Sequence, residues 1–125
     1  MTTKVMVIGL DCAVPEFIFD RRDFELPNIR RLKQNGIWGR LKSTIPPVTV
    51  PAWTSMMTSK DPGTLGFYGF RNRKDYSYDN MFYATSNLIK DNAVWDILSG
   101  LNKKVVLIGV PQTYPPRAIN GVMIS

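Results

Sequence analysis

Two short apolar runs rich in β-branched residues constrain the fold of this chain more than any other feature. They are residues 4–10 (KVMVIGL) and residues 104–110 (KVVLIGV), and both end at a polar or turn segment. Such runs are typical of strands buried on both faces of a parallel sheet, which needs helices to cover it. The sequence therefore predicts an α/β fold with a doubly wound, mostly parallel sheet.

Three segments carry the signals of helices. Residues 27–34 and residues 51–59 each begin with a proline, which suits the first turn of a helix. Residues 92–101 are amphipathic, and Asn92 is the expected N-cap. The helix at 27–34 would complete a strand–helix–strand unit with a second strand at residues 37–44.

The remaining segments predict a further strand at residues 121–125 and a long structured loop at residues 66–80, which is rich in Gly, Tyr and Arg. The sequence stops inside that last expected strand, with no helix to cover it. A parallel sheet needs both faces buried. We therefore expect residues 1–125 to form the N-terminal part of a single α/β domain, and we expect the exposed sheet to favour self-association.

Composition excludes several classes of protein. The chain has no histidine, which removes serine–histidine triads and histidine metal ligands, and its single cysteine allows no internal disulfide. Its net charge of +6 comes from scattered residues, so a solvated surface explains it better than a nucleic-acid partner does. No run is long and apolar enough for a membrane span or a signal peptide, and a cytoplasmic location is expected.

Several residues are expected to serve packing alone. Cys12 is interpreted as a small buried hydrophobic residue. Core positions are predicted for the three tryptophans, Trp38, Trp53 and Trp95. Packing of the central loop against a part of the protein beyond these residues, rather than base stacking, is favoured for its aromatic residues, namely Phe67, Tyr68, Phe70, Tyr76, Tyr78, Phe82 and Tyr83.

Asp11 and Thr49 are the two residues placed where chemistry is expected. Asp11 directly follows the first apolar run, and ligands of open α/β sheets bind beyond the carboxyl ends of the strands. There its carboxylate would either bind a divalent cation or cap the following turn. Thr49 follows two prolines and precedes the helix predicted to begin at Pro51. At a helix N-terminus its hydroxyl would either meet an anionic phosphate or cap the helix.

A resemblance to a known family joins these residues. Asp11, the later Leu-Pro-Asn-Ile segment at residues 26–29 and the segment Thr-Ile-Pro-Pro-Val-Thr-Val-Pro-Ala-Trp-Thr-Ser at residues 44–55 resemble the type I phosphodiesterase/nucleotide pyrophosphatase branch of the alkaline phosphatase superfamily. Thr-Ser-Lys-Asp-Pro at residues 58–62 is similar to the family segment Thr-Gly-x-x-Pro that follows the nucleophile. The similarity runs over residues 5–125.

The resemblance implies a metal-dependent hydrolase of phosphate esters. Asp11 and Thr49 would both bind one of two divalent metal ions, usually zinc, with manganese or magnesium as alternatives. Thr49 would form a covalent threonyl-phosphate that water then hydrolyses. The family's other Asp and His ligands come from later segments, so this chain alone is expected to bind zinc weakly and to be inactive.

The chain also departs from the family pattern. It has Leu65-Gly66 where the family often has His-Gly, and Phe70 where nucleotide pyrophosphatases hold a phosphate oxygen with an asparagine. Arg71, Asn72 or Arg73 would take over that substrate-binding role, or they are ordinary solvated loop residues. This departure puts nucleotide substrates in doubt more than phosphoryl transfer.

Two other functions stay open. A phosphomutase or phosphotransferase of the same superfamily would carry a large insertion after the nucleophile, whereas here the next core strand follows Thr49 within about 60 residues. A non-catalytic basic module would bind nucleic acid or another anionic partner with an affinity that falls steeply with salt.

Overall fold

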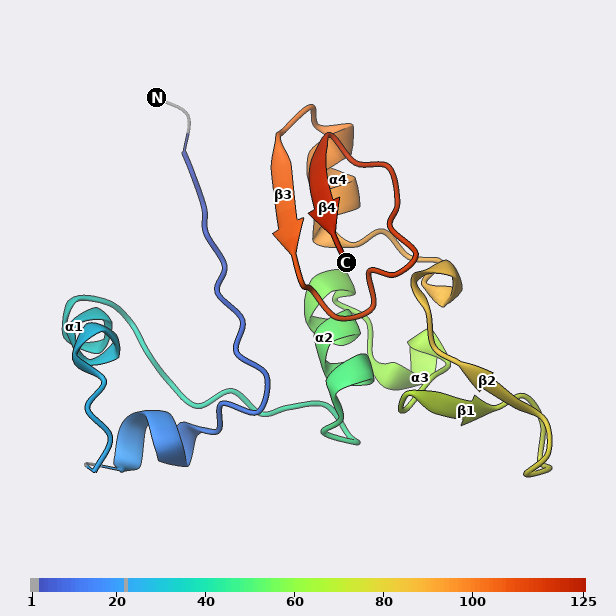
Figure 1. Cartoon of the computed structure of the whole chain (residues 1–125), viewed down its shortest axis with the longest axis horizontal. Coiled ribbons are helices and arrows are strands. Elements are labelled where there is room, and N and C mark those ends of the chain that lie inside the picture. The colour runs from blue at the N-terminus through green and yellow to red at the C-terminus, as the bar shows by residue number, and fades with distance from the viewer. Residues whose placement is uncertain (1–2, 22) are drawn as a thin grey trace. The chain divides into compact units, whose positions relative to one another are not determined.

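The computed structural model describes residues 3–21 and 23–125, and it divides the chain into two compact units, residues 1–42 and residues 43–125 (Figure 1). Each unit is described by itself. Within the described residues, no helix is long and apolar enough to cross a membrane.

The first unit consists of a short π-helical turn, η1 (Glu16–Asp20), and the helix α1 (Pro27–Asn35). The prediction of a helix at 27–34 is confirmed, with Pro27 at its first position. Arg40 donates to the carboxylate of Glu16 at 2.8 Å and also pairs with Asp20, which brings the segment after α1 back to η1. Side chains on the surface hold this unit together, since neither helix has a buried residue.

The two strands predicted in the first unit are wrong. Neither residues 4–10 nor residues 37–44 belong to a strand, and the sheets among the described residues contain neither segment. An apolar run becomes a strand only where a neighbouring backbone completes the ladder of hydrogen bonds. Without such a neighbour Cys12 is exposed and Trp38 is 50% exposed, which corrects the prediction that both are buried.

Five helical or strand segments form the first half of the second unit. The helix α2 (Thr49–Thr58) is followed by the short helix α3 (Pro62–Leu65), which was not among the predicted helices. The strands β1 (Arg71–Arg73) and β2 (Met81–Tyr83) pair as an antiparallel hairpin, and the 3-10 turn η2 (Ser86–Leu88) comes next. The hairpin corrects the prediction of a loop at residues 66–80.

The second half of this unit contains the helix α4 (Val94–Gly100) and the strands β3 (Val105–Ile108) and β4 (Gly121–Ile124). These three elements confirm predictions, although α4 begins after an Ala93 cap rather than at Asn92. The strands β3 and β4 are parallel. A side-chain carbon at Gly121 would lie 1.7 Å from the Val105 carbonyl oxygen, so only glycine fits beside β3 at this position. The α/β class is confirmed, and the doubly wound sheet stays a prediction.

Two hydrophobic clusters form the core of the second unit. One joins α2 to both ends of the hairpin segment through Val50, Phe67 and Ile89, with Leu65 and Ala84 packed against them. The other joins α4 to β3 through Ala93, Trp95 and Leu107. The outer face of the β3–β4 pair is uncovered among the described residues, and it exposes Val106, Ile108, Val122 and Ile124.

Within this chain, only some of the tryptophans and central aromatic residues are buried, and packing of the others against a further part of the protein stays a prediction. Trp95 is buried and Trp53 is partly buried. Phe67 is 1% exposed, which confirms its packing role. The aromatic residues that lie on the hairpin and its turn are mostly exposed, however, namely Tyr68, Phe70, Tyr76, Tyr78 and Tyr83.

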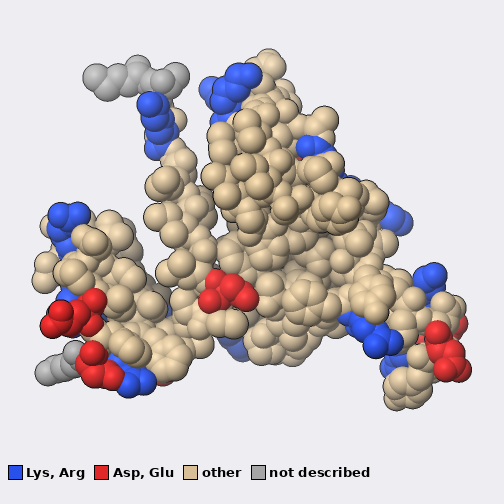
Figure 2. All heavy atoms as spheres, in the orientation of Figure 1, with Lys and Arg blue, Asp and Glu red and all other residues tan. Residues whose placement is uncertain are grey.

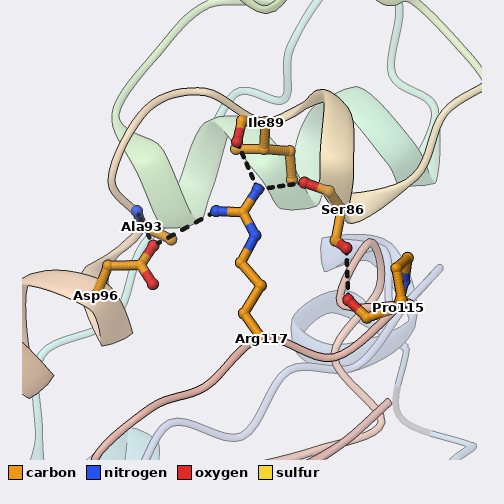
Figure 3. A network of polar contacts seen from close by, with 6 residues as sticks. All are labelled: Ser86, Ile89, Ala93, Asp96, Pro115 and Arg117. Atoms are coloured by element: carbon orange, nitrogen blue, oxygen red, sulfur yellow. Dashed lines mark hydrogen bonds and ion pairs between the residues drawn. The ribbon is translucent and has the colours of Figure 1, made fainter.

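Arg117 ties the segment before β4 to the segment before α4 (Figure 3). Its guanidinium donates to the carbonyl oxygens of Ser86 and Ile89 and lies 4.0 Å from the Asp96 carboxylate. The Ser86 hydroxyl in turn donates to the Pro115 carbonyl at 2.5 Å. One planar side chain therefore satisfies backbone groups of η2 and an acidic residue of α4 together.

Arg117→Ala is expected to destabilise the second unit by about 1.5–3 kcal/mol, because two carbonyl groups and a carboxylate lose a charged donor. Arg117→Lys keeps the charge but not the fork of donors, and it should recover only part of this loss. Urea unfolding measures both, with Lys103→Ala as an exposed control. Equal stabilities of the alanine variant and the unchanged chain would contradict this role.

Candidate functional site

Asp11 lies in a turn of the first unit, directly after residues 4–10. The Ala13 amide donates to the Leu10 carbonyl at 3.4 Å and closes this turn. The Cys12 thiol donates to Asp11 Oδ2 at 3.7 Å, and Cys12 adopts a left-handed conformation with φ of 57°. Asp11 is exposed, so its carboxylate can be reached from solvent.

Thr49 is the first residue of α2, two positions earlier than the sequence predicted the helix to begin. The N-cap residue is Val48, whose side chain makes no capping hydrogen bond. Thr49 is partly buried, whereas Val50 and Pro51 after it are buried. The helix therefore holds the Thr49 backbone in place at its positive end, which favours an approaching anion.

Two buried threonines of α2 bond to the backbone of their own helix. The Thr54 hydroxyl donates to the Val50 carbonyl at 2.8 Å, and the Thr58 hydroxyl donates to the Thr54 carbonyl at 2.7 Å. Both residues are buried. Their hydroxyl groups are thus engaged inside the helix, whereas Thr49 lies at its first position.

Asp61 caps α3, the helix in the segment that resembles the family's Thr-Gly-x-x-Pro motif. Its carboxylate accepts from the Thr64 hydroxyl at 2.8 Å and from the Thr64 amide at 3.1 Å. These bonds, the one from the hydroxyl foremost, hold the pKa of Asp61 below its ordinary value. Asp61 is therefore a structural cap of the loop that follows α2.

This cap predicts a pH dependence of stability. Because the folded-state pKa of Asp61 is lowered, its contribution is present above the ordinary pKa and is lost as the pH falls through the lowered one. Asp61→Asn should therefore be less stable than the unchanged chain at neutral pH, and the gap should narrow at about pH 3. Thermal unfolding at both pH values measures this, and a gap that does not change with pH would contradict it.

Arg71, Asn72 and Arg73 form β1, and the strand alternation separates them. Arg71 and Arg73 are exposed, whereas Asn72 is buried. The Asn72 side chain accepts from the Tyr68 amide at 2.7 Å and donates to the Gly69 carbonyl at 2.8 Å. Asn72 thus shapes the turn before β1, and the two arginines are the members of this trio that face solvent.

The hairpin and α2 share a hydrophobic cluster, whereas Asp11 belongs to a different unit. Phe67 and Ala84, which flank the hairpin, pack in one cluster with Val50, the neighbour of Thr49. Asp11 belongs to the other unit. Packing was predicted for Tyr78 and Tyr83, and the hairpin that brings them beside the two arginines was not predicted, because strand pairing does not follow from local sequence patterns.

The oxygen atoms of Asp11 and Thr49 are suitable ligands for a hard or borderline divalent cation, but two side chains do not complete its coordination sphere. Each residue offers oxygen, the ligand atom that such cations accept. Among residues 3–21 and 23–125, no group of three or more His, Cys, Asp or Glu side chains could hold a metal ion.

Comparisons with known proteins agree with this reading of the sequence. The family model described as type I phosphodiesterase / nucleotide pyrophosphatase matches residues 5–122, which is nearly the whole chain. No curated protein and no solved structure matches it.

Proposed function

Because the chain belongs to the type I phosphodiesterase / nucleotide pyrophosphatase family, we propose that it supplies Thr49 as nucleophile and Asp11 as metal ligand to a phosphoester hydrolase. The observation that carries this proposal is the position of Thr49 at the start of α2, within a family match that includes both residues. Small phosphate esters are the substrates, in keeping with the family.

The proposed reaction has two steps at Thr49. The hydroxyl oxygen attacks phosphorus and gives up its proton to solvent, and a P–O bond to Thr49 forms. The P–O bond to the leaving alcohol breaks with its electron pair on the alcohol oxygen, which takes a proton from solvent. Water then attacks the threonyl-phosphate, which releases phosphate or a phosphate monoester and restores the hydroxyl. The positive end of α2 stabilises the charge on the phosphoryl oxygens in both steps.

Asp11 and Thr49 would hold one divalent cation, zinc foremost and manganese or magnesium as alternatives. A bound cation would lower the pKa of the hydroxyl, which is a weak nucleophile on its own, and neutralise charge on the phosphate. The chain has no histidine. We therefore propose that the ligands that complete a two-metal centre come from residues outside these 125, and that this chain alone is inactive.

Hydrolysis of aryl phosphate mono- and diesters tests this proposal. The complete protein is here the polypeptide that contains this chain together with the residues that supply the remaining metal ligands. It is expected to hydrolyse these esters with zinc, manganese or magnesium, and to lose activity in a chelator. This chain alone should show none. Absence of hydrolysis by the complete protein with all three metals, or full activity in the chelator, would contradict the proposal.

The transferase alternative has less support. Between α2 and β3 the chain forms only two short helical segments, a hairpin and α4, rather than an inserted domain.

Self-association remains a separate proposal. It would use the outer face of β3 and β4, where Val106, Ile108, Val122 and Ile124 are exposed.

A further inference from the structure

The outer face of the β1–β2 hairpin carries two arginines beside two tyrosines. Arg71 lies directly opposite Tyr83 in the register, and its guanidinium carbon is 5.9 Å from the centre of the Tyr83 ring. The guanidinium carbon of Arg73 is 4.9 Å from the centre of the Tyr78 ring. Tyr78 is 82% exposed and Tyr83 is 67% exposed, so both pairs are open to solvent.

The inner face of the same hairpin fixes this arrangement. Asn72 points inward and is tied to the backbone of Tyr68 and Gly69. Its partner Phe82 is partly buried. Since successive side chains of a strand point to opposite faces, burial of Asn72 sends Arg71 and Arg73 outward, about 7 Å apart along the strand.

The hairpin carries three cations and two acids, so its net charge is positive. Lys74 follows the two arginines, and Figure 2 shows basic side chains gathered around this part of the molecule with acidic atoms at its outer end. The acidic residues there are Asp75 and Asp79. Asp75 accepts from the Ser77 amide and the Asn80 side chain, both at 2.8 Å, so its carboxylate is engaged in the turn.

We propose that this outer face binds single-stranded nucleic acid. The two arginines would contact successive phosphates, and the rings of Tyr78 and Tyr83 would stack against unpaired bases. Every base has a flat π-face, so this binding would tolerate different sequences. It is a function beyond ester hydrolysis, and it needs neither Thr49 nor a metal ion.

The paired geometry favours nucleic acid over an acidic protein. The carboxylates of an acidic peptide would pair with the arginines, but such a peptide has no bases to stack on the exposed tyrosine rings. Scattered charge along the sequence argued against a nucleic-acid partner. The fold supplies a local arrangement that charge counting does not reveal, because Arg71 and Tyr83 are twelve positions apart in the chain.

Binding of the whole chain to a labelled oligothymidylate at about 50 mM salt, in a metal chelator, tests the proposal. The chelator removes the metal that phosphoester hydrolysis would need, so the result for nucleic-acid binding does not depend on the proposed hydrolase activity. The double variant Arg71→Ala/Arg73→Ala should weaken binding at least about 10-fold and reduce the slope of log affinity against log salt by about 1.4. A control that removes two exposed cations elsewhere, Arg31→Ala/Lys103→Ala, should leave the affinity within about 2-fold.

The aromatic half of the surface needs its own variant. Tyr78→Ala/Tyr83→Ala should weaken binding about 10-fold or more while the salt slope stays the same, because stacking is lost and phosphate contacts are kept. Arg71→Lys/Arg73→Lys should keep the slope as well. The proposal is overturned if the unchanged chain does not bind, if the hairpin variants bind like the control, or if polyglutamate competes as well as unlabelled oligonucleotide.

Discussion

Thr49→Ala is expected to reduce phosphoester hydrolysis by the complete protein at least about 10³-fold, because loss of a nucleophile removes the covalent route altogether. Thr49 stands at the first position of α2, and its backbone is held by the buried residues that follow. The expected loss is in kcat, measured with an aryl phosphate diester in the presence of zinc.

Thr49→Ser and Thr49→Val are the matched controls for this prediction. Serine keeps a hydroxyl group at the same position, so part of the activity should remain. Valine keeps the shape of threonine without the hydroxyl, and it should be as inactive as alanine. Undiminished turnover in the valine variant would remove Thr49 from the chemistry.

Phe67→Ala is expected to destabilise the second unit by about 3–5 kcal/mol, the usual effect of truncating a buried phenylalanine. Phe67 is 1% exposed and packs with Val50 and Ile89. Its removal leaves a cavity beside α2, so the hairpin should loosen as well. Urea unfolding followed by tryptophan fluorescence measures the loss.

Phe70→Ala is the control for that variant. Phe70 belongs to the same chain segment but is 60% exposed, and its truncation should change stability by no more than about 0.5 kcal/mol. Similar losses in the two variants would contradict the assignment of Phe67 to the core.

Local signals predicted the helices well. Proline at the first position of α1 was evident from the sequence, and the predicted helix agrees with the observed one to one residue. The prolines before Thr49 and at Pro51 indicated α2, although the helix begins at Thr49 itself. Such signals act within one or two turns, so they can be read without knowledge of the fold.

Strands depended on information that local patterns do not contain. Residues 4–10 and β3 (Val105–Ile108) have almost the same composition, yet only β3 has a neighbouring strand, β4. The hairpin strands β1 and β2 have three residues each, too few for a period of two to stand out. Pairing partners decide both cases, and these lie eight or more positions away in the sequence, outside the window of a local pattern.

In the candidate site, too, some features follow from local sequence and others depend on strand pairing. The position of Thr49 at a helix start followed from its neighbours in sequence. The inward orientation of Asn72 and the contact of Arg71 with Tyr83 depend on hairpin register, so the sequence offered Arg71, Asn72 and Arg73 as equals. Only the folded hairpin shows that Asn72 shapes the loop while Arg71 and Arg73 face solvent.

The most direct test of the account is to trap the covalent intermediate. The complete protein, mixed with a phosphate ester substrate and quenched in acid within one turnover, is digested and analysed by mass spectrometry. A phosphoryl group on Thr49 is expected to appear with substrate and to disappear as substrate is exhausted. A phosphoryl group on another residue, or an unmodified Thr49 throughout active turnover, would contradict it.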